Sequence, residues 1–176
     1  MAARLSNTDT AVFLLEEQGM DPGVQGQYGR NAFLQACAYG NIKIVKYLAA
    51  KYPNLIDSTD GNNNNGLHLA DRWYNGIYTV VYLIEELKMD PAVQGEYGRN
   101  AFLQACEFSG NIETVKFLAD KYSKLINSVD DNNNNGLHLA VHSSHATQDI
   151  VVFLTKKLGM DPDHSGSGIQ DFSGSP

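Results

Sequence analysis

The stretch Met20–Ala36 reads MDPGVQGQYGRNAFLQA, and nearly the same sequence returns at Met89–Ala105 as MDPAVQGEYGRNAFLQA. The offset is 89 − 20 = 69 residues. The two stretches differ at two positions, which are Gly23/Ala92 and Gln27/Glu96. A second block, Gly40–Ala70, resembles Gly110–Ala140 at an offset of 70. Self-similarity at a fixed period indicates a repeat architecture, so shared positions are expected to build the fold and changed positions to carry individual function.

Each block is a doublet of two helix-pair units of about 34 or 35 residues, because GRNAFLQAC, from Gly29, aligns with NNNGLHLAD, from Asn63. In the first unit Asn31 precedes a short apolar helix, AFLQACAY. An asparagine side chain there can accept from the free amides of the first helical turn. Gly40 suits the left-handed end of this helix, and a second apolar helix follows. Four such units are predicted to start near residues 29, 63, 98 and 133, after a partial unit from Thr8.

The two asparagine runs, Asn62–Asn65 and Asn132–Asn135, are interpreted as ordered turns rather than disordered linkers. Asparagine tolerates left-handed backbone better than other non-glycine residues, and it also caps helices. Each run is therefore expected to turn the chain and to start the next short helix.

The short helices resemble those of ankyrin repeats, whose first helix opens with Thr-Pro-Leu-His-x-Ala. Residues 65–70 read NGLHLA, and residues 135–140 repeat these letters. The family's glycine and its Ile-Val-x-x-Leu second helix match Gly40–Leu48, GNIKIVKYL. The sequence departs from the family pattern because Asn replaces Thr in every unit and Ala or Gly replaces Pro. Leu34 and Leu103 replace the histidine in half of the units.

This resemblance extends from about Thr8 to Pro162, and it implies an all-α fold: an ankyrin-type helical-repeat solenoid of antiparallel helix pairs with hairpin-like turns. The array is assigned to residues 1–162, and the Gly- and Ser-rich residues 163–176 to a flexible tail or a cloning scar. The implied function is non-enzymatic binding of another protein, of unknown identity, through a concave face of turn tips and first helices. The alternatives are a structural or self-associating array, or a targeting fragment of a larger multidomain protein. The near-identical copies fit tandem duplication and an engineered origin equally well.

Composition excludes several classes of partner. The 176 residues carry a formal net charge of −7, and no clustered basic face is visible, so binding to nucleic acid or to an acidic membrane is not expected. No apolar run approaches the roughly 18 residues that span a bilayer. The short stretch Ala11–Leu15 lacks the length and the cleavage site of a signal peptide. We therefore expect an intracellular, cytoplasmic protein in which Cys37 and Cys106, two units apart, are buried and reduced.

The residue types that usually carry chemistry follow the repeat, which favours structural roles for them. His68 and His138 occur once per doublet, so they lie apart along the stack and cannot share a metal ion. The sequence contains no phosphate-binding loop, zinc-protease motif or nucleophile elbow. No catalytic residue, metal or cofactor is predicted. Asn127 matches the family's hydroxylatable turn asparagine, but the upstream leucine spacing is off by one, so its modification stays open.

Candidate contact residues are those that the repeat register places at the turn tips and at the ends of the first helices. Trp, Tyr and Arg are enriched in binding hot spots. The segment Arg72–Tyr74 holds the only tryptophan of the chain, and the other copy has an unrelated sequence there. Packing of Trp73 or Tyr74 against the neighbouring unit is the alternative. The predicted partner-binding residues are Gln27, Tyr28, Arg30, Tyr39, Arg72, Trp73, Tyr74, Glu96, Tyr97, Arg99, Phe108 and His142.

The repeat breaks off after Asp161-Pro162, where DHSGSGIQDFSGSP replaces the expected continuation. No polar capping unit follows, so the outer face of the last unit, with Leu154 and Leu158, is predicted to be exposed. Three consequences are open: a fragment of a longer array, self-association through the uncapped C-terminal end, or Ile169 and Phe172 folding back.

Overall fold

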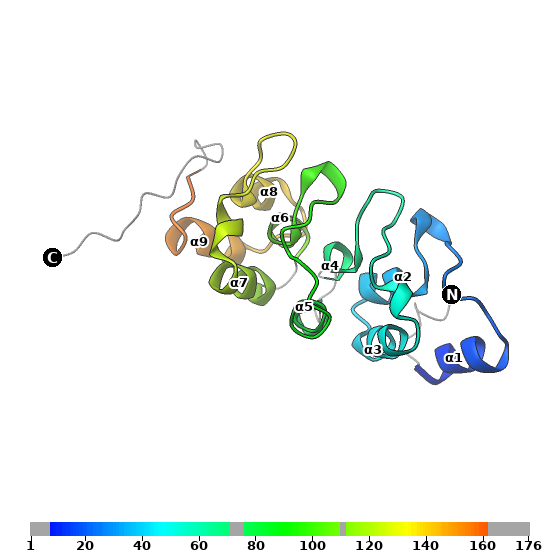
Figure 1. The fold of residues 1–176 in the computed structure, drawn as a ribbon. Helices are drawn as coiled ribbons and strands as arrows, with labels where there is room; N and C mark the ends of the chain where they lie inside the picture. The colour runs from blue at the N-terminus through cyan, green and yellow to red at the C-terminus, as the bar shows by residue number, and fades with distance from the viewer. Residues whose placement is uncertain (1–7, 71–75, 110–111, 162–176) are drawn as a thin grey trace.

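The computed structural model describes residues 8–70, 76–109 and 112–161, which form helices and turns without a strand (Figure 1). The short inner helices are α2 (Ala32–Ala38), α4 (Gly66–Leu69), α6 (Ala101–Phe108) and α8 (Gly136–His142). The outer helices are α1 (Thr8–Val12), α3 (Ile42–Lys51), α5 (Gly76–Glu85), α7 (Ile112–Lys121) and α9 (Gln148–Lys156). Shorter helical turns are the π-helix η2 (Phe13–Glu17), which extends α1, and the 3₁₀ helices η3 (Gln27–Gly29), η4 (Pro53–Leu55), η5 (Glu96–Gly98) and η6 (Ser123–Asn127).

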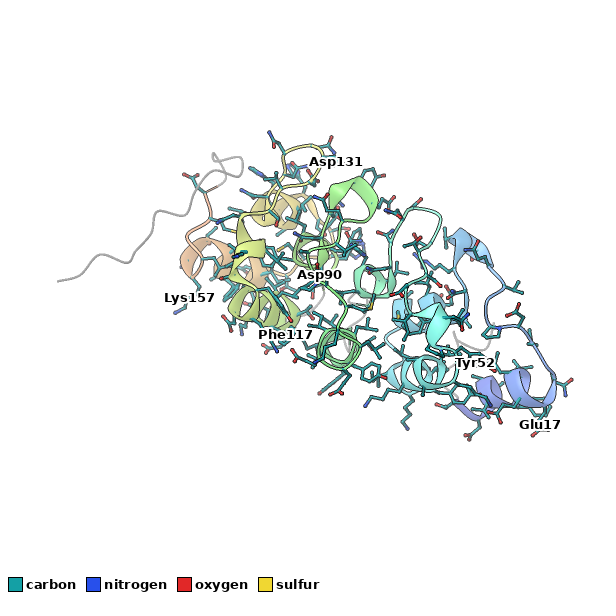
Figure 2. All side chains as sticks on the ribbon, viewed as in Figure 1. Glu17, Tyr52, Asp90, Phe117, Asp131 and Lys157 are labelled. Carbon is teal, nitrogen blue, oxygen red and sulfur yellow. The ribbon has the colours of Figure 1, made fainter. Side chains whose placement is uncertain are left out.

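The helices stack in two layers, and hairpin-like turns project together from one side (Figure 1). The inner helices pack in the order α2, α4, α6, α8, and the outer helices in the order α1, α3, α5, α7, α9. Each inner helix also packs against the outer helix that follows it. Figure 2 shows Asp131 at a turn tip and Phe117 on the opposite side of the stack. The predicted all-α stack of helix pairs is confirmed, with α1 as an outer helix whose inner partner is not among the described residues.

Asparagine starts every inner helix, as predicted. The side chains of Asn31 and Asn100 accept from the amides of Leu34 and Leu103, each at 3.0 Å. Asn65 and Asn135 cap α4 and α8 in the same way, and there a histidine three residues on completes a capping box. Each cap satisfies helix amides that would otherwise lose their hydrogen bonds on burial. Removing such a cap typically costs about 1 kcal/mol.

The asparagine runs are ordered turns. Asn63 and Asn133 have φ values of 62° and 64°, the left-handed region that asparagine tolerates. Asn64 is 1% exposed, and its amide donates to Asp60 Oδ1 at 3.0 Å. Because a buried, hydrogen-bonded side chain cannot belong to a flexible linker, the interpretation as turns is confirmed.

Close approach of the inner helices explains why glycine stands where the ankyrin motif has proline. A Cβ on Gly136 would lie 2.8 Å from Cys106 Sγ and 3.1 Å from Phe102 Cε1. Gly66 meets Cys37 and Phe33 in the same way, at 3.0 and 3.1 Å. These two glycines therefore let α4 and α8 approach the preceding inner helices at a spacing that no side chain would allow.

The prediction that Leu154 is exposed is wrong. Leu154 is 0% exposed, because Ile150 and Leu154 lie one turn apart on the face of α9 that meets the core. Leu158 is half-buried against the same core. The large apolar side chains exposed on this last unit are instead Val141 and Val152, at 60% and 40%. Among the described residues, none of the helices has the length and apolar character that spanning a bilayer requires.

Candidate protein-interaction surface

Tyrosine side chains stand at the tips of two turns. Tyr28 in η3 and Tyr97 in η5 are 64% and 56% exposed. Both have a left-handed backbone, with φ values of 62° and 59°. This conformation is uncommon for a bulky side chain, and strain of this kind gathers at functional sites. In the first turn the Gly26 amide donates to the Arg30 carbonyl at 2.9 Å and closes the loop. The turns thus hold two large aromatic groups in solvent.

Arginine joins each tip to the following turn. Arg30 Nε lies 3.2 Å from Asp60 Oδ2, and the guanidinium lies 5.2 Å from the centre of the Tyr28 ring. The second copy repeats this arrangement with Arg99 and Asp130, at the same 3.2 Å. The two arginine side chains are 13% and 12% exposed. Each guanidinium therefore supports its tyrosine from below and offers little surface of its own to a partner.

The Asp130 carboxylate receives the backbone amides of Asn132 and Asn134, both at 2.9 Å. Burial raises the pKa of Asp130, but these bonds and the pair with Arg99 outweigh burial and hold the pKa below its ordinary value of 3.8. Its contribution to stability is therefore fully present above about pH 3.8 and is lost as the pH falls through the lower folded pKa. The recurrence of Asp60 and Asp130, at 130 − 60 = 70, is the signal in the sequence that points to this shared role.

Glu96 is bound to the preceding turn. Its carboxylate accepts from Asn62 Nδ2 at 2.9 Å and from Asn64 Nδ2 at 3.4 Å. Its amide donates to Asn64 Oδ1 at 3.1 Å. The matching residue, Gln27, is exposed at the first tip, where the described residues include no earlier turn. The difference between Gln27 and Glu96 therefore follows from the place of each turn in the array.

The remaining candidates lie at the ends of inner helices. Tyr39 is half-buried after α2, and Phe108 is half-buried at the end of α6, with its ring centre 6.0 Å from that of His145. His142 is exposed at the end of α8. Arg72–Tyr74 lie outside the described residues. The most exposed of the described candidates are thus at the tips and at the end of α8.

A family model described as ankyrin repeats (3 copies) matches residues 1–94 and 67–165. The chain belongs to the ankyrin repeat family. Ankyrin repeats are generally protein–protein interaction modules, and the family is typically non-enzymatic.

The ankyrin fold also recurs among solved structures. A chain of the structure described as the predatory endopeptidase Bd0816 from Bdellovibrio bacteriovorus in complex with the immunity protein Bd3460 matches with a TM-score of 0.66 and 22% sequence identity. The match covers 89% of this chain and 78% of that chain. Because 529 chains of known structure match, the likeness establishes the fold and selects no partner. A search of curated proteins gave no match.

The ankyrin-motif histidine His68 ties neighbouring units together. Its Nδ1 accepts from the Asn65 amide at 3.2 Å, while its Nε2–H donates to the carbonyls of Val93 and Arg99 at 3.0 and 3.1 Å. This pattern requires the neutral ring. Burial lowers the pKa of His68 below its ordinary value of 6.5, against the opposing effect of the two carbonyl bonds. The predicted structural role of this histidine is supported by these contacts.

Acidification is expected to destabilise the array through His68. Because its folded pKa lies below its unfolded value, its contribution is fully present above about pH 6.5 and declines as the pH falls toward the folded pKa. The melting temperature should fall between about pH 7.5 and pH 5.5. A His68→Gln variant should show a smaller slope of melting temperature against pH, whatever its stability at neutral pH. Equal slopes for the variant and the wild type would contradict this assignment.

No described group of side chains suggests catalysis. Cys37 and Cys106 are fully buried, and burial strongly raises the pKa of the Cys37 thiol, which makes it a poor nucleophile. Within residues 8–70, 76–109 and 112–161, no three His, Cys, Asp or Glu side chains are arranged to hold a metal ion.

Proposed function

We propose that this ankyrin array, assigned to residues 1–162, binds another protein without catalysis, through the concave surface formed by its turn tips and inner-helix ends. The observation that carries this proposal is the pair Tyr28 and Tyr97, exposed at equivalent tips on strained backbone and backed by arginine. A tyrosine offers large contact area with few rotatable bonds, so little conformational entropy is lost on binding. A complex of ordinary size would bury about 800 Å² on each partner.

The tryptophan segment extends the same surface. Trp73 and its neighbours Arg72 and Tyr74 follow α4 in the sequence, where the register places the end of the inner helix. They are the residue types most enriched in hot spots. We include them in the proposed surface on this sequence argument.

The proposal is tested first by affinity capture and then by measured affinity. The wild type is used to capture a partner from cell extract, and the partner is identified by mass spectrometry and purified. Calorimetry is then expected to show that Tyr28→Ala/Tyr97→Ala and Trp73→Ala/Tyr74→Ala each weaken binding by about 2 kcal/mol or more, roughly thirtyfold. The matched control is Tyr78→Ala, which removes a tyrosine that is 68% exposed on outer helix α5.

A glycine variant separates contact from stability. Tyr97→Gly removes the side chain and relieves the left-handed strain, so the free energy of unfolding should not fall while binding weakens as in the alanine variant. Affinities within twofold of wild type for both tip variants, or a larger loss for Tyr78→Ala, would rule out the tip surface.

A further inference from the structure

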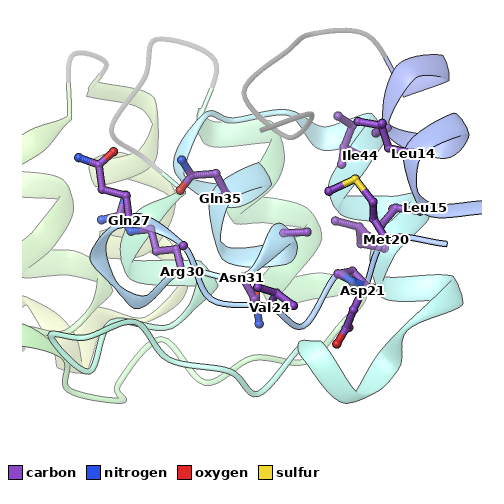
Figure 3. Close-up of a pocket in the computed structure, with 15 residues that line it drawn as sticks. Leu14, Leu15, Met20, Asp21, Val24, Gln27, Arg30, Asn31, Gln35 and Ile44 are labelled. Atoms are coloured by element: carbon purple, nitrogen blue, oxygen red, sulfur yellow. The ribbon is translucent and has the colours of Figure 1, made fainter. Parts of the chain in front are cut away.

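The first end of the array contains a pocket of about 390 Å³ between η2, the first turn and α2 (Figure 3). One end of the pocket is apolar, with Leu14, Leu15, Met20 and Ile44, and the other end is polar, with Arg30 and Gln35 (Figure 3). The η2 wall is held on α3, because Glu16 accepts from the Tyr47 hydroxyl at 2.8 Å and pairs with Lys51. The pocket is therefore preformed.

The second copy of the sequence shows what fills the equivalent place. There, Asn64 Oδ1 accepts from the Glu96 amide at 3.1 Å, and His68 Nε2–H donates to the carbonyls of Val93 and Arg99. Subtracting the offset of 69 places these carbonyl acceptors at Val24 and Arg30, and both residues line the pocket. The pocket is thus the place that the turn and inner helix of a preceding unit would occupy.

Two glycines with the same backbone make the comparison quantitative. Gly26 and Gly95 have φ, ψ values of −103°, −141° and −110°, −140°. A Cβ on Gly95 would lie 2.6 Å from Asn64 Oδ1 and 3.0 Å from His68 Cδ2. A Cβ on Gly26 would meet the Arg30 carbonyl at 3.8 Å and open space otherwise. The same sequence is therefore filled in one copy and open in the other.

A polar atom at this place also lacks a partner. Gln35 Oε1 is buried and accepts no hydrogen bond, although Gln35 lines the pocket. A buried acceptor without a donor is costly, so a ligand that donates to it is favoured.

We propose that this pocket binds, in trans, a short helical segment of a partner protein with the chemistry of Asn64–Leu69. That chemistry is a turn amide, a ring N–H donor and two aliphatic side chains on a helix that starts with a small residue. The bound segment continues the established interface between successive inner helices, because α2 presents to it the side that α6 presents to α4. In the repeat register the matching segment lies ahead of Met1, so it comes from outside the present sequence. A second copy of the chain is disfavoured, because Leu67 in α4 and Leu137 in α8 are already buried in their own array.

The experiment uses the whole isotope-labelled chain and a synthetic peptide of sequence GNNNNGLHLA, which is Gly61–Ala70. An isolated helix this short is marginal in water, so amide chemical shifts are followed up to millimolar peptide. We expect saturable shifts at residues 22–35 and none at the matching residues 91–104, which serve as the internal control. The peptide with His68→Ala should bind at least fivefold more weakly. No shifts, equal shifts in both copies, or shifts confined to the turn tips would overturn the proposal. Shifts of residues 22–35 on raising the protein concentration without peptide would also overturn it, because the occupant would then be a second copy.

A variant of the protein gives an independent check. Gly26→Ala should lower peptide affinity at least tenfold and leave the melting temperature near the wild-type value. Gly95→Ala, on the same backbone, should lower the melting temperature, because its Cβ meets Asn64 and His68. Wild-type affinity in a folded Gly26→Ala protein would overturn the proposal.

Discussion

Replacing Asp60 by alanine is expected to lower the free energy of unfolding by about 3–5 kcal/mol. The Asp60 side chain is 1% exposed and pairs with Arg30. It also receives the amides of Asn62 and Asn64, each at 3.0 Å. Removing it leaves a largely buried guanidinium without its carboxylate and two turn amides without acceptors.

The second copy provides a graded comparison. Asp130→Ala removes the same interactions, but Arg99 keeps an ion pair with Glu107, where the first copy has Ala38. Its cost should therefore be smaller than that of Asp60→Ala by about 1 kcal/mol. Urea denaturation with matched m-values measures both, and Asp120→Ala, at an exposed position on α7, is the control. Equal losses for Asp60→Ala and Asp130→Ala would contradict the role given to Glu107.

Replacing Phe102 by alanine is also expected to cost about 3–5 kcal/mol. Phe102 is 0% exposed, and its ring lies where α8 approaches α6 most closely, at Gly136. The ring cannot be replaced by movement of α8 alone, because Cys106 Sγ is already close to the Gly136 backbone. A cavity therefore remains, and the atoms that line it no longer have the van der Waals attraction of the ring, which adds to the destabilisation.

The size of this effect is checked against an exposed phenylalanine. Phe13 is 44% exposed, so Phe13→Ala should change the free energy of unfolding by no more than about 0.5 kcal/mol. A loss below about 1 kcal/mol for Phe102→Ala would show that the junction between α6 and α8 repacks.

The features that could be predicted from the sequence are those set by neighbouring residues. Asn31 and Asn65 cap helices because a cap spans three residues, and Asn63 is left-handed because its own side chain tolerates that backbone. The repeat of these local signals at a constant period was enough to predict the stack of helix pairs. It was also enough to place Tyr28 and Tyr97 at the tips.

Contacts between units were decided by the tertiary structure. Arg30 and Asp60 are 30 residues apart, and Glu96 and Asn64 are 32 apart, so no local pattern pairs them. Leu154 was predicted to be exposed because the sequence shows where the repeat stops, whereas its burial depends on which face of α9 meets the core. Gly26 and Gly95 have identical flanking residues from Val24 to Gly26 and from Val93 to Gly95, yet one faces a pocket and the other faces Asn64 and His68.

The repeated sequence by itself therefore determined the helices, the caps and the turns of this protein, because these depend on interactions within one unit. Which repeated side chains are occupied by scaffold contacts, and which remain open to a partner, was decided only by the tertiary structure. The physical reason is that each unit completes its hydrogen bonds and its apolar burial on its neighbours, and the first unit lacks one of them among the described residues.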